Sequence, residues 1–576
     1  MADRLISAHG GQLVQGLLDE RQVEEIKKEM IEWPSWTLSE RQLCDLELLL
    51  SGAFSPLKGF MGRADYESVC ESMRLSDGTL WPLPICLDLD EGLAGLAAGS
   101  HLVLRDPEGV ALSLLDVEET WRPDLEREAR LVFGGHAEHP GVVYLRRRTG
   151  PVYAGGRIRG LEMPRHPDFA ELRLGPAALR ARLERSGWKR IVAFQTRNPM
   201  HRAHVELTLR AAEQLDAGLL LHPVVGQTKP GDVDHFSRVR CYRAALAHYP
   251  KGLAMLSLLP LAMRMGGPRE ALLHAIVRRN HGCSHLIVGR DHAGPGSDSA
   301  GQPFYGPYEA QELMRAHRDE LGIEMVPFKM MVYVKGRRRY FPVDELPPGE
   351  ASETLSGTQF RQMLERGAEI PDWFSYPEVV AELRRSYPPR ERQGLCVFFT
   401  GLPSSGKSTL ANLLAVRLLE VGGRQVSLLD GDIVRTHLSS ELGFSREHRD
   451  INIRRIGFVA SEIVKNGGVA ICAPIAPYER VRAEVREMVS AQGGFFLVHV
   501  STPLGVCEQR DRKGLYAKAR QGIVEAFTGI SDPYEEPRDA ELSIDTSGCT
   551  ADEGVGRVLE RLAAEGYIEM TQKEPG

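Results

Sequence analysis

The stretch that decides the fold of this chain is Leu395-Cys-Val-Phe-Phe-Thr-Gly-Leu-Pro-Ser-Ser-Gly-Lys-Ser-Thr409. An apolar run leads into the spacing G-x-x-x-x-G-K-S, from Gly401 to Ser408. The two glycines let backbone N–H groups face a phosphate, the lysine reaches the β- and γ-phosphates, and the serine hydroxyl can ligate Mg²⁺. Residues 409–420 have helical periodicity, so a helix N-terminus points at the same anion. The stretch predicts an ATP-binding domain with a parallel sheet.

The composition excludes several classes of protein. With 576 residues the chain is too long for one core and suggests three or four domains. The formal net charge of −7 gives no basic excess for nucleic acid, and the apolar runs are far short of a membrane span. Residues 1–11 lack the apolar core of a signal peptide. Nine scattered cysteines without a C-x-x-C pair fit a reducing cytoplasm and argue against structural zinc.

Four regions can be separated along the chain. Residues 1–168 are rich in Gly and Pro with short apolar runs, which predicts a β-rich domain. Residues 169–327 alternate strands with helices, which implies a doubly wound parallel sheet of Rossmann-like type. Residues 328–390 form a small third region that ends in a Pro-rich and charged linker, and residues 391–576 are a second α/β domain around the phosphate loop. The expected fold is therefore α/β and multidomain.

A second unusual stretch, Gln195-Thr-Arg-Asn-Pro-Met-His-Arg-Ala-His204, follows a predicted strand and opens a predicted helix. Pro199 suits a first helical turn, and His201 and His204 share one face at the positive end of that helix. The alternative is a capped helix start with two surface histidines. The cation Arg197 and the polar Gln195 beside them favour an anion-binding site instead.

A third stretch, Leu286-Ile-Val-Gly-Arg-Asp-His-Ala-Gly-Pro-Gly296, places charged residues at the end of a strand. Ligands of open α/β sheets bind at that edge. The glycines permit close backbone approach, so the Ala293 N–H could face an oxyanion. A plain strand-ending turn is the alternative, and the clustered charges of Arg290, Asp291 and His292 favour the site.

Residues 195–207 and 289–296 resemble the signature segments of ATP sulfurylase (sulfate adenylyltransferase), and the resemblance covers about residues 1–388. It implies a β-rich PUA-like N-terminal domain, a Rossmann-like nucleotidyltransferase domain and a small third subdomain. It also implies that sulfate attacks the α-phosphorus of MgATP and that pyrophosphate leaves. The roles it implies are sulfate binding by Gln195, Arg197 and Ala293; catalysis by Thr196, Arg197 and Asn198; and ATP binding by Gln195, Asn198, His201, His204, Gly289, Arg290, Asp291, His292 and Val332.

The residues after the phosphate loop carry a second resemblance, to adenylyl-sulfate (APS) kinase, over nearly all of 393–570. Its segments are Val426-Ser-Leu-Leu-Asp-Gly-Asp-Ile-Val-Arg435 and those at 442–457, 469–478, 511–520 and 527–537. It implies ATP binding by Gly401, Leu402, Pro403, Ser404, Ser405, Gly406, Lys407, Ser408 and Thr409, with Ser408 and Asp432 near Mg²⁺ and Asp432 and Lys407 in catalysis. The adenylyl sulfate site it implies is Asp432, Arg435, Phe444, Arg449, Asn452, Ile475, Ala476, Lys513 and Phe527.

Two departures from the kinase pattern stand out. Ala476 replaces the usual serine of Ile-Ser-Pro-Tyr, so a phosphorylated serine intermediate is excluded and transfer should be direct. The segment Gly-Ile-Ser531-Asp shifts a carboxylate by one place and leaves its role open. Core packing is the alternative role for Phe444 and Phe527.

The two resemblances together imply a bifunctional enzyme that acts on ATP, sulfate, pyrophosphate and adenylyl sulfate. Both families commonly oligomerise, so the resemblance also implies a homo-oligomer, and the cysteine usage indicates the cytoplasm. Its first half makes adenylyl sulfate, and its second half phosphorylates the 3′-hydroxyl of that product. We expect Mg²⁺ as cofactor, no zinc, flavin or nicotinamide, and neither nucleic acid nor membrane as partner. The alternative is an APS kinase whose sulfurylase-like region is an inactive oligomerisation scaffold. A degenerate kinase domain that acts only as a sensor is disfavoured, because Gly401–Ser408, Asp432 and Lys513 are present.

Overall fold

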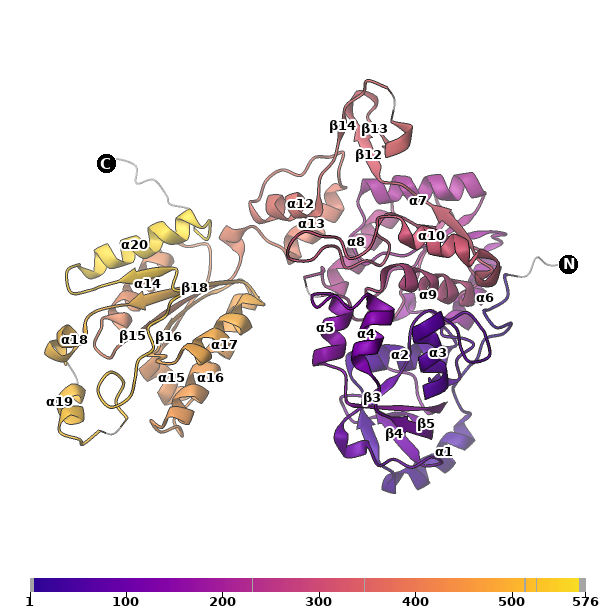
Figure 1. The fold of residues 1–576 in the computed structure, drawn as a ribbon. Coiled ribbons are helices and arrows are strands. Elements are labelled where there is room, and N and C mark those ends of the chain that lie inside the picture. Colours follow the sequence, from indigo (N-terminus) through magenta and orange to yellow (C-terminus); the bar gives the residue numbers. More distant parts are fainter. Residues whose placement is uncertain (1–4, 230, 347, 512–513, 525, 569–576) are drawn as a thin grey trace. The chain divides into compact units, whose positions relative to one another are not determined.

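The computed structural model describes residues 5–229, 231–346, 348–511, 514–524 and 526–568. The chain divides into two compact units, one of Met1–Leu355 with Pro371–Glu382 and one of Ser356–Ile370 with Leu383–Gly576. Figure 1 shows the elements of each unit. This division has two units rather than four segments, and it groups residues 356–370 with the phosphate-loop unit. It does not test the boundaries of the four predicted segments, which stay a prediction.

The first unit begins with a mostly antiparallel sheet in the order β1-β4-β5-β6-β2, with β3 paired to β6. Its strands are β1 (Ser35–Thr37), β2 (Gly59–Phe60), β3 (Leu87–Leu89), β4 (His101–Arg105), β5 (Ala111–Trp121) and β6 (Val152–Gly160). The helices are α1 (Glu20–Glu29), α2 (Glu40–Ser51), α3 (Arg63–Ser72), α4 (Leu125–Phe133) and α5 (Pro140–Arg147). The helix α2 starts at a capping box, in which Ser39 and Gln42 bind each other's backbone N–H groups. The predicted β-rich start is confirmed.

The next sheet of this unit is parallel and has the order β11-β10-β7-β8-β9. Its strands are β7 (Ile191–Phe194), β8 (Gly218–Leu221), β9 (Ala254–Leu256), β10 (His285–Val288) and β11 (Glu324–Pro327). The helices are α6 (Pro176–Ser186), α7 (Arg202–Leu215), α8 (His235–Leu246), α9 (Gly267–Asn280), α10 (Glu309–Ala316) and α11 (Arg318–Leu321). Strand order reverses between β7 and β10, because Ala193 pairs with both Leu220 and Leu286. A reversal of this kind leaves a crevice at the carboxyl ends of the strands.

A small antiparallel sheet follows, in the order β13-β12-β14. It consists of β12 (Met331–Val334), β13 (Arg339–Pro342) and β14 (Ser352–Glu353), and the helices after it are α12 (Gly357–Glu365) and α13 (Pro377–Ser386). Short 3-10 helices lie at Met30–Glu32, Glu91–Leu93, Ala170–Leu172, Lys335–Arg337, Val343–Glu345 and Arg390–Arg392.

The second unit contains a parallel sheet in the order β16-β17-β15-β18-β19. Its strands are β15 (Leu395–Gly401), β16 (Val426–Asp430), β17 (Val469–Ala473), β18 (Gly494–Val500) and β19 (Leu542–Ile544). The helices are α14 (Lys407–Val421), α15 (Gly431–His437), α16 (Arg446–Lys465), α17 (Glu479–Ser490), α18 (Leu504–Arg510), α19 (Leu515–Arg520) and α20 (Ala551–Ala564). The predicted parallel sheet around the phosphate loop is confirmed.

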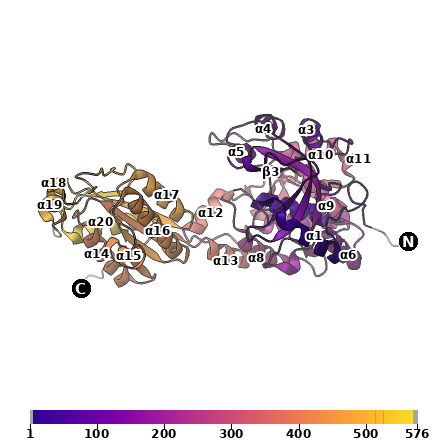
Figure 2. The same cartoon turned by 90° about the horizontal axis from the view of Figure 1, so that it is seen from below.

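The strand β15 lies at the centre of this sheet and is buried on both faces. Leu395, Val397 and Phe399 pack in one core with residues of α14 and α20. Cys396 and Phe398 pack in another core with residues of α16 and α17. Helices therefore cover both faces of the sheet (Figures 1 and 2), which is why β15 is a continuous apolar run rather than an alternating one.

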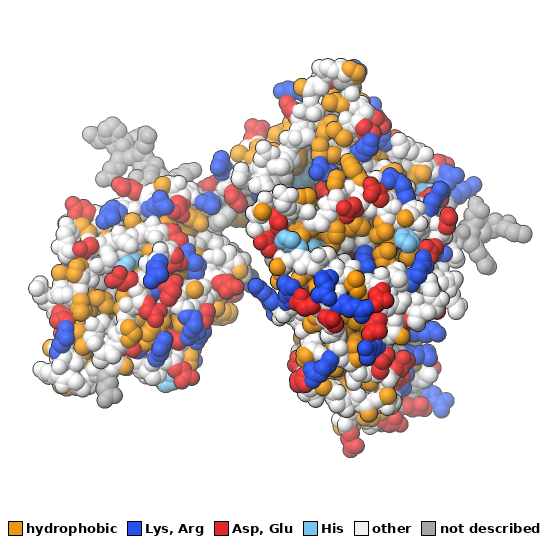
Figure 3. All heavy atoms as spheres, in the orientation of Figure 1, with side chains coloured by type: hydrophobic (Ala, Val, Ile, Leu, Met, Phe, Trp, Pro, Cys, Tyr) orange, Lys and Arg blue, Asp and Glu red, His pale blue; other side chains and the backbone are white. Residues whose placement is uncertain are grey.

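Basic and acidic side chains are interspersed over the face of the molecule in Figure 3. Among the described helices, none combines the length and the apolar character that a membrane crossing requires.

A buried carboxyl group lies in the core of the N-terminal sheet. The Glu128 side chain of α4 is 6% exposed, and its Oε2 accepts hydrogen bonds from the hydroxyls of Tyr66 (3.0 Å) and Tyr153 (3.1 Å). Burial raises the pKa of Glu128 to about 7. Because the folded state holds this proton more tightly than the unfolded state between about pH 4.5 and 7, stability falls as pH rises through that window.

We expect Glu128→Gln to remove this loss of stability. The variant should be more stable than the wild type at pH 8 by up to about 3 kcal/mol, with little difference near pH 4.5. Thermal unfolding at both pH values measures the effect. Glu126→Gln, at an exposed pair with Arg146, is the matched control. An unchanged pH dependence in Glu128→Gln would contradict the assignment.

Candidate active sites

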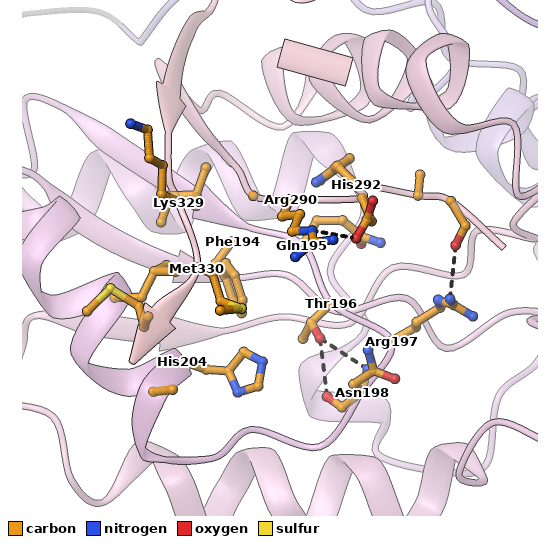
Figure 4. A pocket seen from close by; sticks show the side chains of 18 of the residues that line it. Phe194, Gln195, Thr196, Arg197, Asn198, His204, Arg290, His292, Lys329 and Met330 are labelled. Atoms are coloured by element: carbon orange, nitrogen blue, oxygen red, sulfur yellow. Dashed lines mark hydrogen bonds and ion pairs between the residues drawn. The ribbon is translucent and has the colours of Figure 1, made fainter. Parts of the chain in front are cut away.

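A cavity of about 360 Å³ opens where strand order reverses between β7 and β10. Gln195 follows β7 directly and Gly289 follows β10, so parallel strands bring the two predicted stretches to one edge (Figure 4). The lining is Phe194, Gln195, Thr196, Arg197, Asn198, Ala203, His204, Leu207, Met263, Ile287, Gly289, Arg290, Asp291, His292, Ala293, Gly294, Lys329, Met330 and Met331. The structure thus brings most of the predicted sulfurylase residues together.

The three residues Thr196, Arg197 and Asn198 form a turn at one side of this cavity (Figure 4). The Thr196 hydroxyl accepts a hydrogen bond from the Asn198 N–H (3.1 Å) and donates to the Asn198 carbonyl (3.2 Å). The hydroxyl of Tyr242 donates to that same carbonyl (3.0 Å). The turn is therefore fixed before any ligand binds.

The guanidinium of Arg197 is held at two points. Its Nη1 lies 2.8 Å from Asp232 Oδ2, and its Nη2 donates to the Gly294 carbonyl (3.2 Å). The Arg197 and Asp232 side chains are only 14% and 8% exposed. Sequence reasoning gave Asp232 no role, because it lies in a loop 35 residues away from Arg197.

The helix α7 begins three residues after Pro199. His201 is its N-cap and Arg202 its first residue, so the expectation that Pro199 lies in the first turn is wrong. The His201 N–H donates to His204 Nδ1 (3.1 Å), and the Arg202 N–H donates to the Phe374 carbonyl (3.2 Å). These contacts use the first N–H groups of the helix and fix where it starts.

The two histidines have different surroundings. His204 lines the cavity, whereas His201 lies outside the lining. The ring of His201 is 4.6 Å from that of Phe374, and its Nδ1 is 2.9 Å from the Ser375 hydroxyl. Burial lowers the pKa of His201 to about 3 and that of His204 to about 4. Both rings are therefore neutral at pH 7, and a neutral imidazole can donate a hydrogen bond to a phosphate.

The turn after β10 has an unusual backbone. Asp291 and Ala293 have positive φ values of 51° and 57°, which side chains other than glycine rarely adopt. Arg290 pairs with the neighbouring Asp291 (3.2 Å), and His292 Nε2 lies 3.1 Å from the buried His274. The strained turn lines the cavity with Gly289 to Ala293, as the prediction requires.

Val332 does not line the cavity. It lies in β12, is 2% exposed, and pairs with Phe341. The residues that precede it, Lys329 to Met331, line the cavity instead. Any contact of Val332 with adenine therefore stays a prediction.

The phosphate loop connects β15 to α14. Positive φ values at Gly401 (152°), Ser404 (58°) and Gly406 (103°) curl its backbone. Lys407 begins α14, and its Nζ donates to the carbonyls of Gly401 (3.0 Å) and Leu402 (2.7 Å). Burial lowers the pKa of Lys407 to about 8. Pro403 and Ser405 complete the loop, and Ser408 and Thr409 are exposed at its helix end.

Arg449 is the centre of a buried polar cluster in the second unit. Its Nη1 donates to the Thr528 hydroxyl (2.9 Å) and pairs with Asp532 (3.0 Å), and its Nη2 donates to the Tyr478 hydroxyl (3.0 Å). The Tyr478 hydroxyl donates in turn to Asp532 Oδ2 (2.7 Å). The carboxylate whose role the sequence left open therefore holds a predicted substrate-binding arginine.

We expect Asp532→Asn to weaken adenylyl sulfate binding, because a neutral amide loses the charge-assisted contact that orients Arg449. The KM for adenylyl sulfate should rise on the order of tenfold, with the KM for ATP little changed. Steady-state ADP release measures both constants. Asp539→Asn, which removes a similar partner from Arg486 (3.0 Å), is the matched control. Equal constants for the two variants would argue against this role.

The other residues predicted to bind adenylyl sulfate differ in their exposure and contacts. Phe444 is 69% exposed, with the Arg435 guanidinium 4.4 Å from its ring. Phe527 is 9% exposed and packs in a small core against Tyr516. The carbonyls of Ile475 and Ala476 accept hydrogen bonds from Thr400 (2.6 and 3.2 Å).

The last three residues of the predicted adenylyl sulfate site are Asn452, Asp432 and Lys513. Asn452 is 5% exposed, and its Oδ1 has no hydrogen-bond partner in the described part of the chain. Asp432 lies in α15, and its side chain is outside the description. Lys513 lies outside the described residues altogether.

One oxygen donor that could ligate Mg²⁺ is exposed beside the phosphate loop. The described residues contain no group of three or more His, Cys, Asp or Glu side chains that could hold a metal. Ser408 offers an exposed hydroxyl at the first turn of α14, and oxygen is the donor that Mg²⁺ prefers. Such a donor fits an ion whose remaining ligands are water and nucleotide phosphates.

Comparison with known proteins finds three families along the chain. The PUA-like domain family matches residues 6–163, the ATP-sulfurylase family residues 170–386, and the adenylylsulphate kinase family residues 393–545. A sulfate adenylyltransferase of Aspergillus fumigatus is 52% identical over 571 residues, covering 98% of this chain and 99% of its own. One from Neurospora crassa is 52% identical over 549 residues, covering 95% and 96%.

A solved structure, described as a hexameric APS kinase from Thiobacillus denitrificans, is also similar over the whole chain. It is 42% identical with a TM-score of 0.81 and covers 99% of this chain and 100% of its own. Fold and sites together define an enzyme with a nucleotidyltransferase domain and a phosphate-loop kinase domain. The chain belongs to the sulfate adenylyltransferase family and carries an ATP-sulfurylase domain followed by an APS kinase domain.

Proposed function

We propose that this chain carries out two successive steps of sulfate activation. The first unit converts ATP and sulfate into adenylyl sulfate and pyrophosphate, and the second unit phosphorylates adenylyl sulfate at its 3′-hydroxyl. The observation that carries the proposal is the cavity between β7 and β10, where Gln195 to Asn198 meet Gly289 to Ala293. A phosphate loop alone would support only nucleotide binding.

In the first step, a sulfate oxygen attacks the α-phosphorus of ATP. The bond from that phosphorus to the bridging oxygen of the β-phosphate breaks, and pyrophosphate leaves with the electron pair. The Gln195 amide, the Arg197 guanidinium and the Ala293 N–H supply donors where several anions meet. Catalysis then comes from positioning and charge stabilisation and needs no covalent enzyme intermediate.

In the second step, the 3′-hydroxyl oxygen attacks the γ-phosphorus of ATP, the bond to ADP breaks, and Asp432 takes the hydroxyl proton. Lys407 and the N–H groups of residues 401–406 hold the phosphates, and Arg449 holds the phosphosulfate. Ser408 and Asp432 would hold Mg²⁺ in part, and the ion would neutralise phosphate charge. Ala476 has no hydroxyl, so the phosphoryl group passes directly between the two nucleotides.

The two steps belong together energetically. The mixed anhydride made in the first step is high in energy, so that equilibrium favours ATP. Consumption of adenylyl sulfate by the second step draws the first one forward. A cytoplasmic enzyme that assembles as a homo-oligomer is part of the proposal, and the hexameric relative from Thiobacillus denitrificans supports the assembly.

A second candidate is a kinase whose sulfurylase region serves only as a scaffold. It is favoured by one finding, that a relative similar over the full chain is described as an APS kinase. Formation of ATP from adenylyl sulfate and pyrophosphate by the purified chain separates the candidates. Kinase activity without this reaction would refute the bifunctional proposal and support the second candidate, in which the sulfurylase region is only a scaffold.

A further inference from the structure

A buried arginine contacts Gln195, which is predicted to bind sulfate. Arg278 of α9 is 0% exposed, and its Nη2 donates to Gln195 Oε1 (2.9 Å) and to the His222 carbonyl (2.8 Å). Sequence reasoning could not find it, because Arg278 lies in an ordinary helical run 83 residues after Gln195. The contact places a cation directly behind the anion site.

The contact fixes the orientation of the Gln195 amide. A guanidinium has donors and no acceptor, so only the amide oxygen can face it. The Gln195 Nε2 then points to the other side, where its neighbour is the weak acceptor Met263 Sδ at 3.8 Å. An amide that presents its NH₂ group to a cavity suits an oxyanion, whereas a flipped amide would present its carbonyl and repel it.

The positive charge of Arg278 has no close counter-ion among the residues that the structure describes. No ion pair joins it to another described residue, and its Nε and Nη1 have no hydrogen-bond partner in that part of the chain. Glu270, which acts on it electrostatically, is bound instead by the N–H groups of Arg264 and Gly266 (2.9 Å each). Burial lowers the pKa of Arg278 to about 9, which leaves it charged at pH 7.

The other titratable groups around Arg278 do not compensate its charge. Burial lowers the pKa values of His222, His274, His281 and His292, so all four rings are neutral at pH 7. Burial raises the pKa of the Cys283 thiol to about 12, so this group is neutral as well. Burying an unpaired charge is costly, and buried charges are normally paired. An anion in the cavity that Gln195 lines would supply the negative charge that this cation lacks among the described residues.

We propose that Arg278 is a positioning residue of the sulfurylase site, which holds the Gln195 amide with its NH₂ group toward sulfate and supplies buried positive charge behind the anion. The inference rests on the proposed function of the first unit. A purely structural role, in which Arg278 only ties α9 to the end of β8 through the His222 carbonyl, predicts lower stability without selective loss of sulfate binding.

Two substitutions separate the charge from the geometry. Arg278→Gln removes the charge and should raise the KM for sulfate on the order of 10- to 100-fold, with the KM for ATP within about twofold of the wild type. Arg278→Lys keeps the charge and should recover part of this loss. Arg269→Gln is the matched control, because Arg269 lies on the same helix and, within the described part of the chain, donates only to the carbonyls of Val69, Cys70 and Pro82.

A double-mutant cycle tests whether Arg278 acts through Gln195. Arg278→Lys should raise the KM for sulfate in the wild-type background and add little in a Gln195→Ala background. Fully additive effects would overturn the positioning role. A KM for sulfate in Arg278→Gln within about twofold of the wild type, or equal to that of Arg269→Gln, would overturn the inference as a whole. Thermal unfolding of each full-length variant monitors the fold.

Failure of the proposed function gives a different result. The wild type would then release no pyrophosphate from ATP and sulfate, whatever residue 278 is. In that case calorimetric titration of sulfate, with an α,β-methylene analogue of ATP present, tests Arg278 by binding alone. Weaker sulfate binding by Arg278→Gln than by Arg269→Gln would still support the inference. Equal sulfate affinity of the two variants would refute it.

Discussion

Lys407→Ala should abolish the kinase reaction and leave the sulfurylase reaction intact. We expect kcat/KM for adenylyl sulfate phosphorylation to fall at least on the order of 10²- to 10³-fold, since a cation is removed from where phosphate charge develops. Pyrophosphate-dependent ATP formation by the same preparation should stay at the wild-type rate. ADP release and ATP formation, measured side by side, give the two activities.

The position of Lys407 explains the size of this effect. Its Nζ donates to two carbonyls of its own loop, those of Gly401 and Leu402, so the side chain already lies across the turn that a phosphate would enter. Burial has lowered its pKa to about 8, which reflects an environment that disfavours a lone cation and gains from a bound anion. Alanine supplies neither the charge nor the donor.

The matched control is Lys465→Ala, an exposed lysine of α16 that pairs loosely with Glu462 (3.7 Å). It should leave both activities unchanged. Loss of both activities in Lys407→Ala, with an unchanged melting temperature, would contradict separate sites. Retention of kinase activity would contradict the role of the loop.

Local sequence patterns were enough to predict the parts of the fold and sites that depend on local order. The strand β15, the loop after it and the helix α14 follow one another along the chain, so periodicity and glycine spacing describe them fully. The residues after β7 and β10 could also be placed together. In a parallel sheet, the carboxyl ends of neighbouring strands meet at one edge whatever the length of chain between them.

Side-chain contacts between residues far apart in the sequence could not be predicted in the same way. Asp232 reaches Arg197, Arg278 reaches Gln195, and Asp532 reaches Arg449 across 35, 83 and 83 residues. None of these partners lies in a motif whose spacing implies the contact. They share one physical feature, which only the structure shows: each supplies a charged or polar partner to a largely buried side chain.

Side-chain direction explains why His201 and Val332, both predicted to bind ATP, do not line the cavity. Three-residue spacing puts His201 and His204 on one face only if both lie inside the helix, and His201 is its N-cap. Alternation in β12 turns Val332 into the core while Met331 reaches the cavity. Both outcomes depend on where an element begins, and element boundaries are what sequence patterns define least well.

Arg197→Ala should have the complementary effect and abolish the sulfurylase reaction while the kinase reaction persists. The guanidinium lines the cavity and is fixed by Asp232 Oδ2 on Nη1 and by the Gly294 carbonyl on Nη2. Its remaining N–H groups can bind an anion without further loss of side-chain entropy. We expect a fall in sulfate-dependent pyrophosphate release on the order of 10³-fold.

Arg197→Lys should recover little of this activity, because an ammonium group cannot hold both of these contacts and present further donors to an anion. Removal of Arg197 also leaves the Asp232 carboxylate without its cation, so the variant should melt at a lower temperature and activity must be expressed per folded molecule. The matched control is Arg173→Ala, which breaks a similarly buried pair with Asp168 (2.7 Å) outside the cavity lining. If Arg173→Ala loses as much sulfurylase activity as Arg197→Ala, the loss reflects stability and the cavity is not the reacting site. If only Arg197→Ala loses it while ADP release continues, the two reactions belong to two separate sites of one chain.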